Sequence, residues 1–379
     1  MFKSKLPRVE QSIFSVMSSM ANKHGAVNLS QGFPNFPVDK QLISLVSNAM
    51  KQGNNQYAPM AGDARLREVI SHKIEKLYSR KFNPESEITI TAGATQAIFT
   101  AISAVIREGD EVILFTPAYD CYEPAVQLMG GVAKKIQLKA PEYKPNWDEV
   151  KATITSKTKM TIINTPHNPS GVIFSESDML QLQTIAEDYN LIVLSDEVYE
   201  HIIFDDLKHQ SAARFSLLSQ RTFITASFGK TFHTTGWKMG YCVAPEKLMK
   251  EFQKVHQYNV FCVNHPFQKA LAIYLENENN YLRLPSFYQN KRDFFLKKIE
   301  GSKFKVIPSQ GTYFQLLDFS EISKESDIQF AERLTKENKI ATIPTSVFNK
   351  NKEDFKQIRV CFAKTEETLL KATAILNSI

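Results

Sequence analysis

The sequence of 379 residues predicts an α/β protein: a mostly parallel central sheet covered by helices on both faces, followed by a smaller α+β domain. Two observations lead to this prediction. Short runs of apolar and β-branched residues alternate with longer helical windows, which is the rhythm of strands joined by crossover helices. Most of these runs are apolar almost throughout, as expected for strands that are buried on both faces of a parallel sheet.

The strands expected in the sheet are Glu87–Thr91, Glu111–Phe115, Lys159–Asn164, Leu191–Ser195, Thr222–Ala226 and Tyr241–Ala244. The helical windows between them include Thr95–Arg107, Ser175–Tyr189 and Pro245–Val255. Several strands end in small polar or turn residues. Because ligands bind beyond the carboxyl ends of the strands in open α/β sheets, we expect the chemistry of the protein at these ends.

The pattern of the chain changes near Leu284. Beyond it we expect charged helices at Tyr288–Glu300 and Ser326–Asn338, and short strands at Tyr313–Leu317 and Gln357–Cys361. We therefore expect three parts. Residues 1–40 form an N-terminal segment that packs with the small domain, residues 41–283 form the large domain, and residues 284–379 form the small C-terminal domain.

Composition excludes several classes of protein. The 46 Lys and Arg against 40 Asp and Glu give a net charge of +6, too small an excess to indicate nucleic-acid binding. No apolar stretch approaches the ~18 residues of a membrane span. The first twenty residues lack the apolar centre of a secretory signal. The four cysteines are scattered, as in reduced thiols of a cytoplasmic protein.

Familiar catalytic signatures are missing from the sequence. Gly229-Lys230-Thr231 resembles the end of a phosphate-binding loop, but the first glycine of that motif is absent. No G-x-G-x-x-G follows a strand, no H-E-x-x-H occurs, and there is no G-x-S-x-G. Nucleotide-dependent enzymes and serine hydrolases therefore have little support, and we expect no metal site.

The strand ends offer other chemistry. Lys230 follows a strand, and an amine there can form a Schiff base if desolvation or neighbouring cations lower its pKa. Asp196 closes an apolar run, where a buried carboxylate needs a cationic partner such as a protonated pyridine nitrogen. The helix that opens at Gly93-Ala94-Thr95 has free amides that can cradle a phosphate. Each residue also has a purely structural explanation: Lys230 as a solvated loop lysine, Asp196 as a helix cap, and Gly93-Ala94-Thr95 as an ordinary start of a helix.

Taken in order, these segments resemble the fold-type I pyridoxal-phosphate aminotransferases of class I/II over nearly the whole chain. The matching segments are Asn28–Pro34, Tyr57–Pro59, Ala92–Thr95, Pro117–Asp120, Asn164–Gly171, Ser195–Tyr199, Ser227–Gly240 and Ile358–Val360. The resemblance implies that pyridoxal 5′-phosphate is the cofactor and that the fold is the type I fold of these enzymes.

The resemblance also implies a role for each residue around the cofactor ring. Lys230 would hold the cofactor covalently and act as the general acid–base. Asp196 would keep the ring nitrogen protonated. Tyr199 and Asn168 would hydrogen-bond the phenolic oxygen, and Tyr119 would stack on the ring.

The phosphate would rest on the Ala94 and Thr95 amides, with contacts from Ser227 and Lys238. Many relatives carry arginine at the position of Lys238, and lysine is a point charge that makes fewer phosphate contacts. Tyr57 in this family reaches the phosphate of the neighbouring subunit, which implies a homodimer.

Arg359 would bind the substrate α-carboxylate bidentately, with help from Asn168 and the Gly32 backbone. The stretches Asp120–Pro124 and Gly236–Lys238 resemble the methionine and kynurenine/glutamine aminotransferases. We therefore expect a large neutral amino donor, with methionine first and aromatic amino acids, glutamine or kynurenine next, and a 2-oxo acid acceptor.

Aromatic side chains are expected near the mouth of the site, namely Phe14, Phe33, Tyr119 and Tyr122, although phenylalanines also fill ordinary cores. Two alternatives stay open. A C–S β-lyase of the cystathionine or cysteine-conjugate type would use the same lysine and cofactor. A non-catalytic ligand sensor with the same fold would need an appended DNA-binding segment, for which we expect no room before Ser12 or after Ile358.

Overall fold

The computed structural model describes residues 3–7 and 9–379, so the expected N-terminal segment is described except at residues 1, 2 and 8. The helices are α1 (Ile13–His24), α2 (Lys40–Lys51), α3 (Ala64–Tyr78), α4 (Ala94–Val105), α5 (Tyr122–Leu128), α6 (Trp147–Thr153), α7 (Glu176–Asp188), α8 (Ser216–Ser219), α9 (Phe228–Thr231), α10 (Glu246–Asn259), α11 (His265–Leu275), α12 (Asn279–Leu282), α13 (Leu284–Ile299), α14 (Asp327–Lys336) and α15 (Glu366–Asn377).

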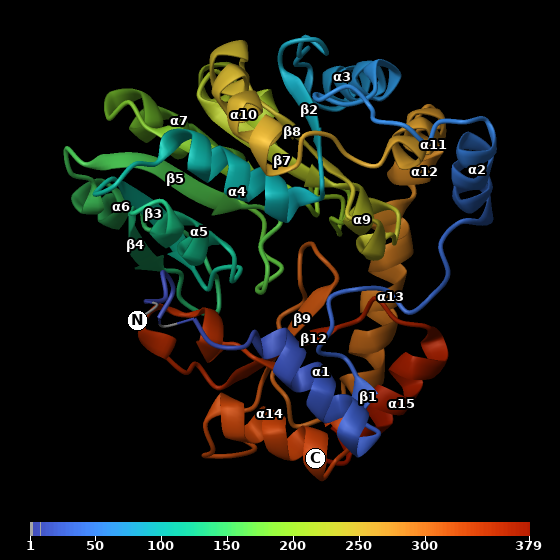
Figure 1. Ribbon diagram of the computed structural model, residues 1–379. Coiled ribbons are helices and arrows are strands. Elements are labelled where there is room, and N and C mark those ends of the chain that lie inside the picture. The colour runs from blue at the N-terminus through green and yellow to red at the C-terminus, as the bar shows by residue number, and fades with distance from the viewer. Residues whose placement is uncertain (1–2, 8) are drawn as a thin grey trace.

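The described residues form one large sheet of seven strands (Figure 1). In spatial order they are β2 (Ile88–Thr91), β8 (Gly240–Val243), β7 (Thr222–Ser227), β6 (Ile192–Asp196), β5 (Thr158–Asn164), β3 (Glu111–Thr116) and β4 (Val132–Gln137). All pairings are parallel except those of β8, which is antiparallel to both its neighbours. The predicted fold class is confirmed.

Successive side chains of the strands point to opposite faces of the sheet, and both faces are buried. In β3, Val112 and Leu114 join the apolar cluster beneath α4 and α10. Ile113 and Phe115 join the second cluster, which includes side chains of α3, α7 and α11. Apolar side chains on both faces of the strand are therefore removed from water, and each Å² of apolar surface buried stabilises the fold by about 25 cal/mol. This two-sided burial explains why the predicted strands are apolar throughout.

The edge strand β4 was not predicted. Its sequence contains Lys134 and Lys135, and only one of its residues, Ile136, is fully buried. Lys134 and Lys135 pair with Glu111 and Glu123 at the sheet edge. Charged side chains are common on edge strands because they discourage pairing with another chain, and here they remove the apolar signal.

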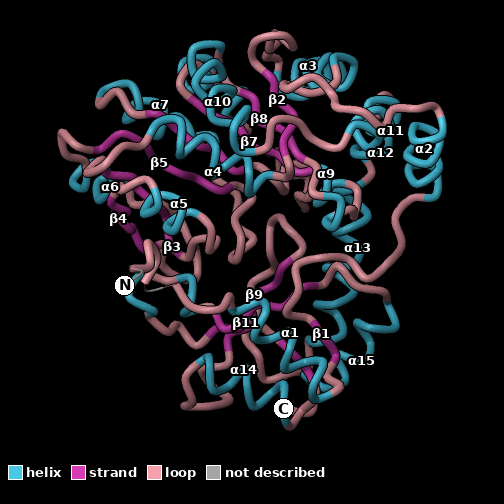
Figure 2. Tube along the Cα trace, in the orientation of Figure 1, coloured by secondary structure: helices cyan, strands magenta, loops and turns pink. Residues whose placement is uncertain are grey.

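A second, smaller part surrounds two short sheets below the large one (Figure 2). Strands β11 (Ile343–Pro344), β12 (Gln357–Cys361) and β9 (Phe314–Asp318) form an antiparallel sheet. Strands β1 (Val27–Asn28) and β10 (Ile340–Ala341) pair in parallel, which places the N-terminal segment against the C-terminal part of the chain. The division of the chain at residues 40 and 283 stays a proposal.

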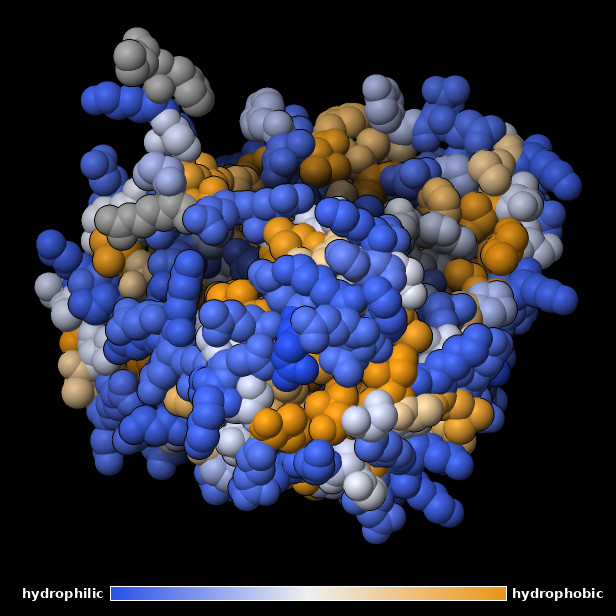
Figure 3. Space-filling model, turned by 90° about the horizontal axis from the view of Figure 1, so that it is seen from below, coloured by the Kyte–Doolittle hydropathy of each residue, from blue (hydrophilic) through white to orange (hydrophobic). Residues whose placement is uncertain are grey.

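The molecular face in Figure 3 is largely hydrophilic, with apolar residues gathered between charged ones. No helix within the described ranges 3–7 and 9–379 is both long and apolar enough to cross a membrane.

Candidate active site

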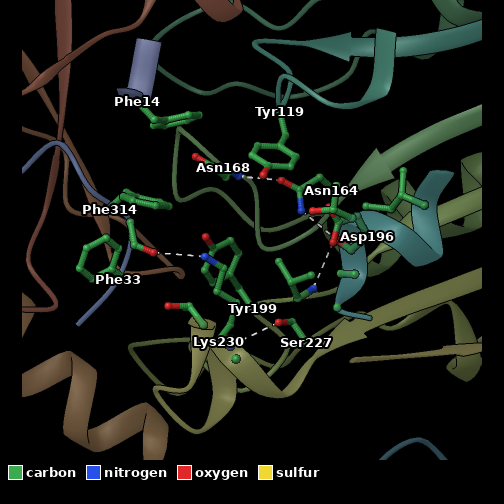
Figure 4. A pocket seen from close by; sticks show the side chains of 18 of the residues that line it. Phe14, Phe33, Tyr119, Asn164, Asn168, Asp196, Tyr199, Ser227, Lys230 and Phe314 are labelled. Carbon is green, nitrogen blue, oxygen red and sulfur yellow. Dashed lines mark hydrogen bonds between the residues drawn. The ribbon is translucent and has the colours of Figure 1, made fainter. Parts of the chain in front are cut away.

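The candidate active site lies where the strands of the large sheet end. Strands β5, β6 and β7 end at Asn164, Asp196 and Ser227. Strand β8 runs the other way and begins at Gly240, opposite both Ser227 and the end of β2. A cavity of about 280 Å³ opens at this edge and is closed from the other side by residues of the small sheets (Figure 4).

Eleven of the predicted site residues line this cavity: Gly32, Ala94, Thr95, Tyr119, Asn168, Asp196, Tyr199, Ser227, Lys230, Lys238 and Arg359. Tyr57 is the exception. Its side chain is 81% exposed, and its ring packs edge-on against Phe261 at 5.3 Å. Within one subunit, Tyr57 is therefore not part of the cavity.

Lys230 lies in α9, the single helical turn that follows β7. The Ser227 side chain begins this turn by accepting a hydrogen bond from the Lys230 backbone N–H at 3.4 Å. The Lys230 Nζ points into the cavity and donates to the Gly32 carbonyl at 3.1 Å. Burial, assisted by the charges of Arg359 and Lys238, lowers the pKa of Lys230 to about 8. A fraction of the amine is thus neutral, and nucleophilic, near neutral pH.

Asp196 is buried at the end of β6, and it makes no ion pair with any residue in the described part of the chain. Its Oδ2 accepts a hydrogen bond of 2.5 Å from the Tyr122 hydroxyl, and its Oδ1 accepts one of 3.3 Å from the Val198 N–H. Burial raises the pKa of Asp196 to about 6, although the Tyr122 hydrogen bond opposes this shift. A buried carboxylate without a cation suits a cationic N–H donor of a ligand.

Asn164 and Tyr122 are the two site residues whose roles sequence reasoning missed. Asn164 donates to the Asp196 carbonyl at 2.9 Å and accepts from the Asn168 N–H at 2.8 Å, so it joins two predicted residues. Asn164 is the last residue of β5, and this position at a strand end could have indicated a site residue from the sequence. Tyr122 was expected at the mouth of the site, but it is 3% exposed and lies beneath Asp196, whereas Phe14, Phe33 and Tyr119 line the cavity.

The N-terminus of α4 forms a cradle for an anion. Gly93 precedes the helix with a φ of +78°, a conformation that favours glycine, and no side chain caps the helix. The Ala94 and Thr95 amides have no acceptor among the described residues. A Cβ at position 93 would lie 3.6 Å from Lys238 Nζ, so this ammonium faces the same cradle.

Arg359 enters the cavity from β12. Its side chain is fully buried, and its Nη atoms donate to Asn168 Oδ1 at 2.8 Å and to the Ser30 carbonyl at 3.1 Å. The Phe314 ring centroid is 3.9 Å from its Cζ, but its Nε has no hydrogen-bond partner and no carboxylate pairs with it in the described ranges. Because arginine stays charged when buried, the guanidinium can receive a carboxylate.

These side chains define the ligand that the cavity accepts. Its lining holds three cations, Lys230, Lys238 and Arg359, and one anion, Asp196. A phosphorylated pyridine aldehyde fits this set of groups. Its phosphate would bind at the N-terminus of α4, its aldehyde would react with the Lys230 amine, and its ring nitrogen would pair with the Asp196 carboxylate. The orphaned Nε of Arg359 remains for the carboxylate of a second ligand.

Comparisons with known proteins point to one family. The family model described as aminotransferase class I and II matches residues 25–376. The chain is 45% identical to a methionine aminotransferase of Escherichia coli, over 99% of this chain and 98% of that protein. It is 35% identical to a kynurenine–oxoglutarate transaminase of Dictyostelium discoideum, over 95% and 92% of the two chains. A solved E. coli structure with methionine aminotransferase function superimposes with a TM-score of 0.97 at 45% identity and full coverage of both chains.

Proposed function

The chain belongs to the class I and II aminotransferases, which use pyridoxal 5′-phosphate, and from this premise we propose that it moves the amino group of a large neutral amino acid to a 2-oxo acid by a ping-pong mechanism. Methionine is the first candidate donor, followed by aromatic amino acids, glutamine and kynurenine. The observation that carries the proposal is that one cavity holds the Lys230 amine, the Asp196 carboxylate and the Arg359 guanidinium, none of which makes an ion pair with the residues that the structure describes.

Each residue has a distinct task in this reaction. The bound cofactor supplies the electron sink that stabilises negative charge at the substrate Cα. Arg359 binds the α-carboxylate through two N–H groups and orients the Cα–H bond. The Lys230 amine, with its lowered pKa, would take the proton from the substrate Cα and, as the general acid, deliver it to the cofactor carbon C4′. Asp196 would hold a proton on the ring nitrogen of the bound cofactor, and Tyr199 and Asn168, which line the same cavity, would bind its phenolic oxygen.

The cavity favours a large neutral side chain on the donor. Phe14, Phe33 and Phe314 line it, and the rings of Phe14 and Phe314 lie beside the Arg359 guanidinium. Burial of an apolar side chain against them is favourable. The three cations in the lining already have tasks, so a second substrate carboxylate would be buried without a partner, at a cost of several kcal/mol. The similarity to methionine and kynurenine aminotransferases supports the same choice.

A donor panel tests the proposal. The reconstituted enzyme is assayed with methionine, phenylalanine, histidine, glutamine, kynurenine, alanine and aspartate against several 2-oxo acids. We expect methionine to have the highest kcat/KM and aspartate to be poor. A preference for aspartate would overturn the donor class. Release of pyruvate and thiol without an amino acceptor would instead indicate a β-lyase.

Lys230→Ala provides the matching residue test. We expect transamination to fall about 10³-fold or more because both the covalent anchor and the acid–base are lost. After borohydride treatment, the wild-type peptide that contains residue 230 should carry the cofactor mass, and the variant peptide should not. Circular dichroism should be unchanged, since the cavity accommodates the smaller side chain.

We also propose a homodimer in which Tyr57 binds the cofactor phosphate of the neighbouring subunit. Tyr57 does not line the cavity of its own subunit, and its side chain is 81% exposed. Its ring packs against Phe261, and Tyr258, three residues before Phe261 in the chain, is 88% exposed. Exposed aromatic side chains of this kind are typical of interfaces.

A further inference from the structure

The strap, which we define as residues Ser30–Phe33, lines the cavity with its last three residues, and a side chain binds each of its four successive carbonyls. Arg359 binds the Ser30 carbonyl at 3.1 Å and Lys230 binds that of Gly32 at 3.1 Å. Tyr313 donates to the Gly32 carbonyl as well, at 2.6 Å. Lys364 binds the carbonyls of Gln31 at 3.3 Å and of Phe33 at 2.8 Å.

Lys364 differs from the other cations in this set because the reaction gives it no task. Its side chain is buried, and it makes no ion pair with any carboxylate in residues 3–7 and 9–379. Its partners are the two strap carbonyls and the Phe33 ring, whose centroid is 5.1 Å from Nζ. The cost of removing the Lys364 ammonium from water offsets much of what its hydrogen bonds to neutral partners contribute to the free energy of folding. We therefore look for its role in the positions of those partners, which its hydrogen bonds fix.

The strap in turn determines where two parts of the cavity wall lie. Gly32 packs directly on Phe314, since a Cβ at position 32 would lie 2.8 Å from that ring. The Phe33 ring lines the cavity and is 44% exposed, so it has apolar surface left to bury against a substrate. Figure 4 shows Phe33 and Phe314 on the same side of Lys230.

We propose that Lys364 is a positioning residue for donor specificity: its ammonium holds the strap by the Gln31 and Phe33 carbonyls and so keeps the Phe33 ring against the side chain of a large neutral donor. When Lys230 and Arg359 turn to cofactor and substrate, Lys364 and Tyr313 are the side chains left to hold the strap. This inference rests on the donor class proposed above.

Lys364→Met, which keeps an unbranched side chain one atom shorter and removes its charge, tests the inference in the holoenzyme. We expect the ratio of kcat/KM for methionine to that for alanine to fall about tenfold, mainly through KM for methionine, because alanine does not reach Phe33. The Kd of the unreactive analogue 4-(methylthio)butanoate should rise to a similar extent, and that of propionate should not.

The matched control is Lys356→Met. Lys356 also binds a backbone carbonyl, that of Glu325 at 2.8 Å, and it pairs with Asp354 at 2.9 Å. Unlike Gln31 and Phe33, the partners of Lys364, these two residues do not line the cavity. Lys356→Met should leave the methionine-to-alanine ratio unchanged. If Lys364→Met is insoluble, Lys364→Gln, which keeps one N–H donor for a carbonyl, takes its place.

A double-mutant cycle with Phe33→Ala separates positioning from general stability. If Lys364 acts through the ring, Phe33→Ala should lower the same ratio, and Lys364→Met should add little to it in that background. An unchanged ratio in Lys364→Met, or fully additive losses, would overturn the role of Lys364 while leaving a methionine-preferring wild type intact. A wild-type preference for aspartate would overturn both this role and the proposed donor class.

Discussion

At the scale of single residues, the Asp196 carboxylate shows how environment sets chemistry. Burial raises its pKa to about 6, and the hydrogen bond from Tyr122 opposes that shift by stabilising the ionised form. A protonated ring nitrogen requires the ionised carboxylate. We therefore expect affinity for pyridoxal phosphate to be highest above pH 6 and to fall as the pH drops through the pKa of Asp196.

Tyr122→Phe tests this relation. The variant keeps the buried ring but loses the O–H donor, so the pKa of Asp196 should rise and the loss of cofactor affinity should begin at a higher pH. A hydrogen bond to a charged group is worth about 1.5–3 kcal/mol, so affinity near pH 6 should fall about tenfold or more. Titration of the apoprotein with cofactor from pH 5 to 8 measures this. Tyr143→Phe, a buried phenol that is bonded to Gln357, is the control and should leave the pH profile in place.

At the scale of elements, the turn after β6 carries two sets of side chains in opposite directions. Asp196 and Tyr199 line the cavity. Glu200, one residue further on, is not part of the cavity lining; it accepts a hydrogen bond from Lys73 of α3 at 2.6 Å and others from Tyr78 and Tyr241. This buried cluster anchors the turn from behind and so holds the two cavity residues in place.

Lys73→Met tests the anchor. Burial alone would raise the pKa of Glu200, but Lys73 outweighs it and holds this pKa below its ordinary value. Removing Lys73 leaves the buried Glu200 carboxylate without a cation at pH 7, because burial lowers the pKa of the neighbouring His201 to about 3 and so keeps it neutral. The free energy of unfolding should therefore fall by about 3–5 kcal/mol in urea titrations at pH 7. The stabilisation by the Lys73–Glu200 pair is fully present above the ordinary pKa of glutamate and is lost as the pH falls through the lowered pKa of Glu200. The difference in the free energy of unfolding between wild type and Lys73→Met should therefore shrink in acid.

Lys76→Met is the control on the same helix. Lys76 pairs with Glu278 at the surface, and its side chain is 55% exposed. We expect a loss of about 0–1 kcal/mol. Equal losses in the two variants would contradict the anchoring role of Lys73.

At the scale of the whole molecule, the proposed exchange of Tyr57 between subunits has a clear experimental signature. Tyr57→Phe should weaken binding of the cofactor about tenfold or more, because a hydroxyl donor to a phosphate is lost. Lys230→Ala subunits lack the anchor but supply an intact Tyr57. After the two variants are mixed by reversible dissociation, each mixed dimer should contain one complete site. Activity should then recover at a limiting cofactor concentration, at which Tyr57→Phe alone stays largely unloaded.

This recovery depends on exchange between subunits. If Tyr57 served only its own subunit, no site in the mixture would hold both Lys230 and Tyr57, and activity would stay low. Sedimentation of each variant alone should show whether both still form the dimer.

The large sheet could be predicted because its strands report their burial locally. Each of the six predicted strands begins and ends within one residue of the observed strand, since both faces are covered and the runs are apolar throughout. Strand β4 was missed because its lysines, which form ion pairs at the edge of the sheet, interrupt the apolar pattern that marks the other strands. Strands β1 and β10 were missed because two residues carry no periodicity, and their pairing joins positions over 300 residues apart in the chain.

The site divides in the same way. Residue type and position at a strand end, which are local properties, predicted Lys230 and Asp196 as site residues, and the family resemblance predicted Arg359. The structure places all three in one cavity. Packing was needed to bring Arg359, from the small sheet, within 2.8 Å of Asn168 in the large one, and to place Lys364 beneath the strap. Packing also moved Tyr122 from the expected mouth to the back of Asp196. Such contacts depend on how two sheets close on each other, and no periodicity within a single segment records that geometry.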